Sequence, residues 1–244
     1  MTGYLYKEIK QNRVYILLTA ILVPVMIFFP LVLVMIEEKT LAKNAFYVFA
    51  YNGMHLRVLF ALIGFAVACV LQSFTLKGDD RKIWGYFVVS NPKGIKGFVV
   101  TKYLLTAAMC LLFFVLGVGF DIAFTFITNC IGGISVPLMT EALAAMVFLM
   151  LLLNAGSIPF TVLFGEKRGS IIRVVIGNVI LILLILAVFK NPIRTVDIIN
   201  DFLENGKIPS MAKWMLPVGS VIAYVISCFI TCKFYLKGVT NSYK

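Results

Sequence analysis

Few side chains in this sequence could carry out chemistry. Histidine occurs once, as His55, so a zinc site of the H-E-x-x-H type is impossible, and no serine is an obvious partner for a Ser/His pair. The five cysteines form no C-x-x-C motif, and Cys228 and Cys232 lie four residues apart, a spacing that favours packing over metal binding. Neither G-x-x-x-x-G-K-[ST] nor G-x-G-x-x-G occurs. The sequence therefore predicts no catalytic, cofactor-binding or metal site.

Three polar residues inside long apolar stretches are candidate pathway residues. Asp121 is a carboxylate with no obvious cationic partner, whereas ion-coupled transporters usually pair ionisable groups near the membrane midplane. Two interpretations of Asp121 stay open: a pathway role, or a position near the outer end of its helix in headgroup water. Asn154 and Asn178 are expected to form hydrogen bonds between helices rather than to bind substrate.

The elements that must hold these residues are membrane helices. Hydrophobic residues make up 61% of the 244 residues and charged residues only 14%, a composition that a soluble fold cannot bury. A helix needs about 20 residues to cross the hydrocarbon core, and backbone hydrogen bonding in lipid favours helices over an open sheet. We predict an all-α integral membrane protein, one unit over 1–244, with six spans. The uncharged stretches are 14–36, 58–76, 103–120, 142–165, 174–189 and 214–232.

The distribution of Lys and Arg predicts the orientation. Fifteen of the 22 lie in the N-terminus, in the links from span 2 to 3 and from span 4 to 5, and in the C-terminal tail, while seven lie in the opposite loops. By the positive-inside rule both termini are expected in the cytoplasm. The net charge of +11 is thus explained by topology and by anionic lipid, without nucleic acid. The first stretch is too long for a signal-peptide core, so we expect it to be retained.

The segment 77–97, between spans 2 and 3, mixes charged and aromatic residues. Asp79 or Asp80 can cap a short helix that carries Trp84, and the pair Asn91-Pro92 ends it. Arg and aromatic side chains anchor protein interfaces, but aromatic side chains also line the headgroup region of membranes. The composition alone leaves both interpretations open.

Three motifs resemble one family. The first motif resembles the first cytoplasmic loop of ABC-2 type transporter permeases. It consists of Trp84, the run 90–93 (SNPK) and the run 98–104 (FVVTKYL). The opening 5–10 (LYKEIK) resembles the N-terminal amphipathic helix of that family, and 164–168 (FGEKR) resembles its loop between spans 4 and 5. One departure is Gly94-Ile95, where the family pattern suggests Ser or Thr beside a basic residue.

The resemblance implies a permease subunit of an ABC exporter in the cell membrane of a bacterium. Its partners are expected to be an ATPase subunit, which binds ATP and Mg²⁺, and a second permease, either identical or closely related; this chain is expected to be non-catalytic and to hold no cofactor. An interfacial helix at 1–13 has Leu5 and Ile9 on one side and basic residues on the other, and an external helix is expected within 190–213. The expected ATPase-coupling residues are Arg81, Lys82, Trp84, Tyr86, Phe87, Ser90 and Pro92, with a second cytoplasmic contact at Glu166, Lys167 and Arg168.

Two further function classes remain. The main alternative is an ion-coupled secondary transporter or channel that uses Asp121, and a membrane-embedded enzyme would have to rely on His55. For an exporter, the 21 Phe and the many aliphatic residues favour a hydrophobic or amphipathic substrate, that is a peptide, lipid or drug. The size is similar to that of permeases of phenol-soluble modulin exporters and of antimicrobial-peptide resistance exporters.

Overall fold

The computed structural model describes residues 2–38, 44–75, 94–132, 138–164, 166–190, 197–198, 200–202 and 207–241, and over these residues it contains helices and no strand. The all-helical prediction is confirmed for this part of the chain. Six helices of 25 residues or more lie within it: α1 (Thr2–Glu38), α2 (Asn44–Thr75), α4 (Gly94–Gly132), α5 (Thr140–Phe164), α6 (Glu166–Lys190) and α8 (Ser210–Asn241).

Four of the predicted spans are confirmed as segments that are long and apolar enough to cross a membrane. Among the described residues these segments are Arg57–Thr75, Lys96–Ile127, Thr140–Leu163 and Ser210–Phe234. The stretches 14–36 and 174–189 are helical, in α1 and α6, and their role as spans stays a prediction. The chain is thus a multi-pass membrane protein.

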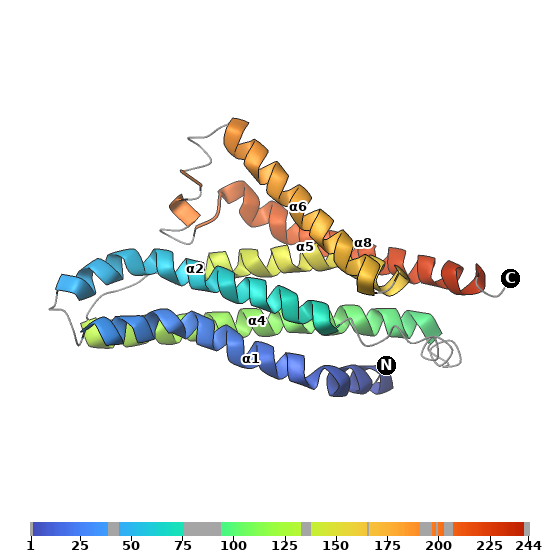
Figure 1. Cartoon of the computed structure of the whole chain (residues 1–244), viewed down its shortest axis with the longest axis horizontal. Coiled ribbons are helices and arrows are strands. Elements are labelled where there is room, and N and C mark those ends of the chain that lie inside the picture. The colour runs from blue at the N-terminus through green and yellow to red at the C-terminus, as the bar shows by residue number, and fades with distance from the viewer. Residues whose placement is uncertain are drawn as a thin grey trace.

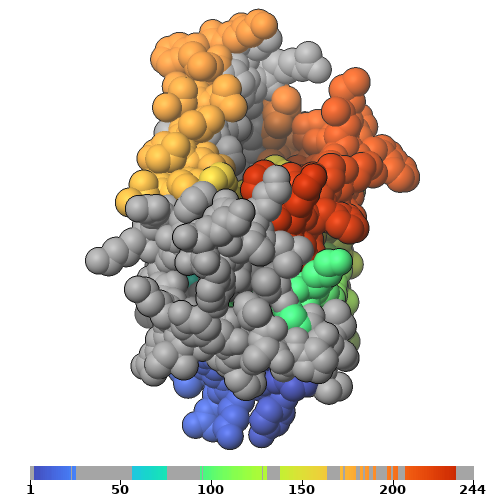
Figure 2. All heavy atoms as spheres, turned by 90° about the vertical axis from the view of Figure 1, so that its right-hand side faces the viewer, coloured from blue at the N-terminus to red at the C-terminus, as the bar shows by residue number. Residues whose placement is uncertain are grey.

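The helices form an elongated bundle (Figure 1). α1 lies against α2 and α4, and α5 lies against α4, α6 and α8. Seen from the end that holds both termini, α6 and α8 project on the side of the molecule opposite to α1 (Figure 2). The end of α6 at Lys190 diverges from the bundle (Figure 1).

Two apolar clusters form the core. The larger one joins α2, α4 and α5, and its fully buried members include Val58, Phe113 and Met150. The smaller one lies where α1, α4 and α5 meet, around Tyr4 and Ile158. Because small side chains such as Ala61 and Ala68 line α2 in the larger cluster, the helices can approach closely, as membrane helices commonly do.

The N-terminal segment is helical, as predicted. Residues 2–13 form the first turns of α1, which runs without a break from Thr2 to Glu38, and their position at the membrane interface stays a prediction. The predicted apolar side, Leu5 and Ile9, is exposed, at 38% and 45%. The buried side is instead formed by Tyr4, Glu8 and Asn12, which recur every four residues. A polar side can be buried here because α4 supplies its partner, as described below.

The start of α4 explains the departure from the family pattern at Gly94. Its φ of 49° lies in the left-handed region, which glycine adopts without the steric cost that a Cβ would add. A Ser or Thr at this position would be strained. The rest of the predicted coupling segment, including Arg81, Lys82, Trp84, Tyr86, Phe87, Ser90 and Pro92, lies outside the described residues.

Two other predicted segments are described in part. Glu166, Lys167 and Arg168 form the first turn of α6, and only their backbone is described. Between α6 and α8, residues 197–198 and 200–202 are helical. An external helix within 190–213 therefore stays a prediction.

Candidate functional site

Four buried polar side chains lie on α4. Thr101, Lys102, Thr106 and Asp121 are each no more than 2% exposed. The hydroxyls of the two threonines form hydrogen bonds within α4, because each donates to the backbone carbonyl four residues earlier. Lys102 and Asp121 reach other helices, so α4 is the element to which the polar contacts of the bundle converge.

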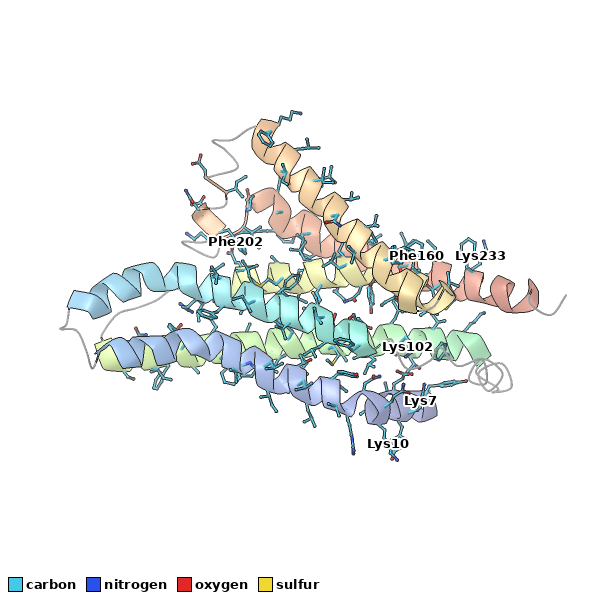
Figure 3. All side chains as sticks on the ribbon, in the orientation of Figure 1. Lys7, Lys10, Lys102, Phe160, Phe202 and Lys233 are labelled. Carbon is cyan, nitrogen blue, oxygen red and sulfur yellow. The ribbon has the colours of Figure 1, made fainter. Side chains whose placement is uncertain are left out.

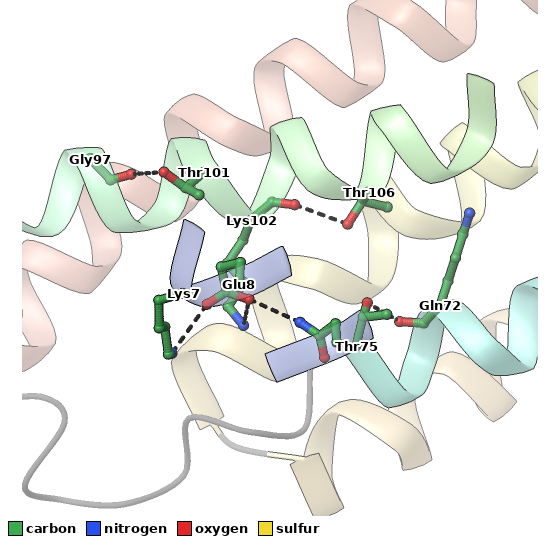
Figure 4. A network of polar contacts seen from close by, with 9 residues as sticks. Lys7, Glu8, Gln72, Thr75, Gly97, Thr101, Lys102 and Thr106 are labelled. Carbon is green, nitrogen blue, oxygen red and sulfur yellow. Dashed lines mark hydrogen bonds and ion pairs between the residues drawn. The ribbon is translucent and has the colours of Figure 1, made fainter. Parts of the chain in front are cut away.

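The first contact joins α4 to α1. Lys102 Nζ lies 2.9 Å from Glu8 Oε2, with both side chains no more than 2% exposed. Asn12 donates to the same oxygen at 3.2 Å, and Lys7 Nζ lies 3.2 Å from Glu8 Oε1 (Figure 4). Lys102 also lies over the ring of Phe98, at 5.7 Å from its centroid. Because a buried charge is stable only when it is paired, this cluster fixes α1 against α4.

The basic residues near this cluster differ in placement. Lys7 and Lys102 lie between α1 and α4, whereas Lys10 points away from the bundle (Figure 3). Lys10 and Arg13 are exposed. The sequence pattern gave no indication that Lys102 pairs with Glu8.

A second contact, at Gln72 on α2, joins three helices. Asn154 of α5 donates to Gln72 Oε1 at 2.6 Å, and Gln72 Nε2 lies 3.4 Å from Cys110 Sγ of α4 and 3.0 Å from Met150 Sδ of α5. Asn154 is 5% exposed. The prediction that Asn154 forms an interhelical hydrogen bond is confirmed.

A group of hydroxyls joins α4, α5 and α8. Tyr103 Oη lies 2.7 Å from Ser227 Oγ and 2.9 Å from Thr231 Oγ1. Ser227 Oγ in turn donates to the carbonyl of Ala155 at 2.5 Å. That carbonyl needs an outside donor, because Pro159, four residues later in α5, has no N–H. Ser227 therefore satisfies a backbone acceptor that lipid could not.

The third contact corrects the prediction for Asp121. Asp121 does have a cationic partner: Arg57 of α2 donates to its Oδ1, and the backbone N–H of Met139 donates to its Oδ2 at 2.7 Å. Arg57 also lies over the ring of Phe124, at 4.5 Å. Asp121 is fully buried, which contradicts the interpretation that water surrounds its carboxylate, whereas its position near the outer end of the span stays a prediction. The sequence did not indicate this pairing, because Arg57 immediately precedes the uncharged stretch 58–76 and its position predicts a place in the loop before that span.

Asn178 behaves differently from Asn154. It lies in α6 with its side chain exposed, so the predicted interhelical hydrogen bond does not form within the described part of the chain. An Asn near the middle of the helix is therefore buried in α5 and exposed in α6.

A further ion pair links the starts of α5 and α8. Glu141 Oε1 lies 2.9 Å from Lys213 Nζ, and both side chains are about two-fifths exposed. Glu141 Oε2 also accepts from the backbone N–H of Ile208 at 3.5 Å. Exposed pairs of this kind contribute only about 0–1 kcal/mol.

The polar contacts hold the helices of the bundle together. Among the described residues, no group of three His, Cys, Asp or Glu side chains could hold a metal ion. Both oxygens of Asp121 are engaged, and Glu8 accepts from two cations and an amide. The polar network, defined here by Glu8, Lys102, Tyr103, Gln72, Asn154, Ser227, Arg57 and Asp121, therefore joins α1, α2, α5 and α8 to α4.

Comparison with known proteins adds one finding. A family model described as ABC-2 family transporter protein matches residues 4–236. No curated protein and no solved structure matches the chain.

Proposed function

The chain belongs to the ABC-2 family of transporter membrane proteins, and from this we propose that it is the permease subunit of an ATP-driven exporter. The observation that carries the proposal is the family match, which extends over nearly the whole chain. Members of this family are generally the non-catalytic membrane subunit. In the proposed topology, six helices cross the plasma membrane and both termini are cytoplasmic, in agreement with the excess of Lys and Arg on that side.

Energy has to come from a partner, because the sequence has no phosphate-binding loop. We assign the contact with an ATPase subunit to the segment 77–93 and to the turn at 166–168. ATP binding by the partner would then favour one arrangement of the permease helices over another.

The polar network supports a route for this coupling. α4 begins at Gly94, directly after the proposed coupling segment. Two turns later, Lys102 is paired with Glu8 of α1, and the adjacent Tyr103 is bonded to Ser227 of α8. A displacement of the coupling segment would therefore be transmitted to α1 and α8 together with α4, since a buried ion pair resists separation.

The transport pathway is proposed to form between two permease chains and to accept hydrophobic or amphipathic substrates. The support is compositional: the apolar spans contain few polar groups that could bind a sugar or an ion. Many polar side chains inside the described bundle bond to one another or to backbone carbonyls, which leaves few of them for a hydrophilic substrate.

A second candidate function has one observation in its favour. The buried pair of Arg57 and Asp121 is the kind of paired ionisable group that ion-coupled transporters use. Against it, Asp121 is also held by the backbone of Met139, an arrangement that suits a fixed structural contact.

The test is energised transport by the reconstituted complex. The permease is purified with any ATP-binding protein that accompanies it, and export of a fluorescent amphipathic peptide from vesicles is followed with ATP. We expect export to stop when the Walker A lysine of the ATPase is replaced, and to survive ionophores that collapse the proton and sodium gradients. Export that ignores ATP but stops with the gradients would refute the exporter and support the ion-coupled alternative.

A further inference from the structure

The hydrogen-bond ladder of α5 is interrupted near its C-terminal end. Pro159 lies inside the helix and has no N–H, so it cannot donate to the carbonyl of Ala155 four residues earlier. Thr161 donates its hydroxyl to the carbonyl of Ser157 at 2.9 Å, a type of side-chain bond that often bends helices. Two features of the sequence therefore lower the resistance of α5 to bending over the same turn.

The packing of α5 changes at the same point. Every described residue of α5 that is buried precedes Pro159, and the last two of them, Ser157 and Ile158, are fully buried. The described residues that follow, 160–163, are only half-buried. The part of α5 before Pro159 is therefore fixed in the bundle, whereas the part after it is held less firmly.

The carbonyl that Pro159 cannot bond to is bound from α8. Ser227, which is 7% exposed, donates its hydroxyl to the oxygen of Ala155 at 2.5 Å. Because this bond uses the single hydroxyl proton of Ser227, Tyr103 of α4 is the donor in its own contact with Ser227, at 2.7 Å. The bonds thus run in one direction, from α4 through α8 to the interrupted turn of α5. Without Ser227, the helix itself would offer this buried carbonyl no donor.

The interrupted turn lies close to the second proposed ATPase contact. Five residues lead from Pro159 to Phe164, the last residue of α5, a length of about 7.5 Å along the helix. α6 begins at Glu166, so the turn 166–168 follows the end of α5 almost directly. This end of α5 points toward the end of the bundle that holds both termini (Figure 1). A force applied at 166–168 would therefore act first on the short arm 160–164.

We propose that α5 bends at a hinge formed by 155–159, that Ser227 holds the carbonyl of Ala155 during the bend, and that the arm 160–164 moves when a partner acts at 166–168. Bending an intact turn would strain or break a backbone hydrogen bond in lipid, whereas here that bond is already replaced by one from α8. Ser227 is also bonded to α4, which begins directly after the first proposed contact, 77–93. This inference rests on the proposed function, because it identifies the part that the ATPase contact at 166–168 would move.

The first experiment tests whether Ser227 replaces the missing N–H, and it requires no transport. Ser227→Ala and Pro159→Ala are made singly and together, and unfolding of the purified permease by SDS is measured in mixed micelles. In the natural chain, we expect Ser227→Ala to raise the unfolding equilibrium constant about five- to hundredfold, because a buried carbonyl loses its donor. In the Pro159→Ala chain the N–H is restored, so the same change should have an effect below about threefold.

Ser220→Ala is the matched control. Ser220 is another buried serine of α8, but it donates to the carbonyl of Pro217 in its own helix, at 3.0 Å. Its effect should be the same in the natural chain and in the Pro159→Ala chain. Pro159→Leu also restores the N–H and repeats the test if Pro159→Ala fails to fold. An equal effect of Ser227→Ala in both chains would overturn the role of Ser227.

The second experiment measures the bend by electron spin resonance in nanodiscs. Nitroxide labels are attached at Leu104 of α4 and Ile171 of α6 through a ketone amino acid, so that the five native cysteines stay in place. The control pair is Leu104 with Leu152, which precedes the hinge, and all three side chains are exposed. A rotation of about 20° would move the end of the arm by about 3 Å. We expect the 104–171 distance to be more broadly distributed than the 104–152 distance, and Pro159→Ala to narrow it.

The partner ATPase with ATP should then shift the 104–171 distance by about 3 Å in the natural chain and by less in the Pro159→Ala chain. A 104–171 distribution no broader than that of the control pair, or one that Pro159→Ala leaves unchanged, would overturn the hinge. ATP-driven export without any shift of the 104–171 distance would overturn the inference and leave the exporter intact. A distribution that Pro159→Ala narrows, together with transport that ignores ATP and follows ion gradients, would refute the exporter but not the hinge.

Discussion

The buried pair of Arg57 and Asp121 allows a quantitative test of whether Asp121 is structural or part of an ion pathway. Asp121→Asn removes the carboxylate charge but keeps an oxygen that can accept from the backbone of Met139. Arg57 would then remain as a buried cation that has lost its carboxylate partner. Removing one partner of a buried pair costs about 3–5 kcal/mol, so we expect Asp121→Asn to lower the free energy of unfolding by about that amount.

A double-mutant cycle isolates the pairing itself. Arg57→Gln alone should cost a similar amount, because it leaves Asp121 charged and unpaired. The double variant should lose less stability than the sum of the two single losses, because neither charge is then buried. We expect the difference in the free energy of unfolding to be about 0.5–3 kcal/mol. Unfolding of the purified permease in mixed micelles, with increasing SDS, measures each value. Glu141→Gln, in the exposed pair with Lys213, is the control and should cost no more than about 1 kcal/mol.

The same variants test the function. If Asp121 is structural, export by Asp121→Asn, normalised to folded permease, should be largely retained and should survive collapse of the ion gradients. If each single variant lowers the free energy of unfolding by less than about 1 kcal/mol, and the double variant loses the sum of the two, Arg57 and Asp121 are not coupled. Full stability combined with complete loss of transport would show that Asp121 acts in a charge pathway.

Three further predictions follow from the other contacts. Glu8→Gln removes the carboxylate that pairs with the buried Lys102, so we expect a loss of about 3 kcal/mol or more in the same unfolding assay. Lys102→Met in that chain should restore most of the lost stability, and no restoration would refute the pairing. Trp84→Ala should abolish ATP-dependent export from a correctly inserted permease, with a loss of about 2 kcal/mol in ATPase binding; unchanged binding and export would assign Trp84 to the headgroup region. Native Cys130, which is exposed, should react with an impermeant thiol reagent in intact cells, and Lys93→Cys only after permeabilisation; the reverse pattern would contradict the orientation.

Helix positions could be predicted from the sequence because lipid makes strong demands on composition. A backbone that cannot bond to water has to be helical, and a span has to be apolar over about 20 residues. These two conditions identified the stretches at 58–76, 103–120, 142–165 and 214–232. The short motifs around Trp84 and Pro92 then led to the family that the comparison identified.

Side-chain partners could not be predicted in this way, because they depend on which helices become neighbours. Arg57 and Asp121 are 64 residues apart, and Glu8 and Lys102 are 94 residues apart. The apolar stretch beginning at residue 58 gave no sign that α2 starts as early as Asn44 and carries Arg57 inside the bundle. Hydropathy gives each charged residue one value, whether or not that residue forms an ion pair in the fold, so it could not reveal the two buried pairs.

The spacing of the two buried ion pairs argues against a charge pathway along α4. Lys102 and Asp121 are separated by 19 residues of one continuous helix, or about 28 Å, close to the 30 Å thickness of the hydrocarbon core. With α4 near the membrane normal, each pair lies at one edge of the hydrocarbon, where a charge costs much less than at the centre. Every residue between them, 103–120, is uncharged. A proton or sodium ion that followed α4 would meet no ionisable carboxylate at the midplane, so both pairs are better explained as contacts that hold α1 and α2 to α4 at opposite edges of the membrane.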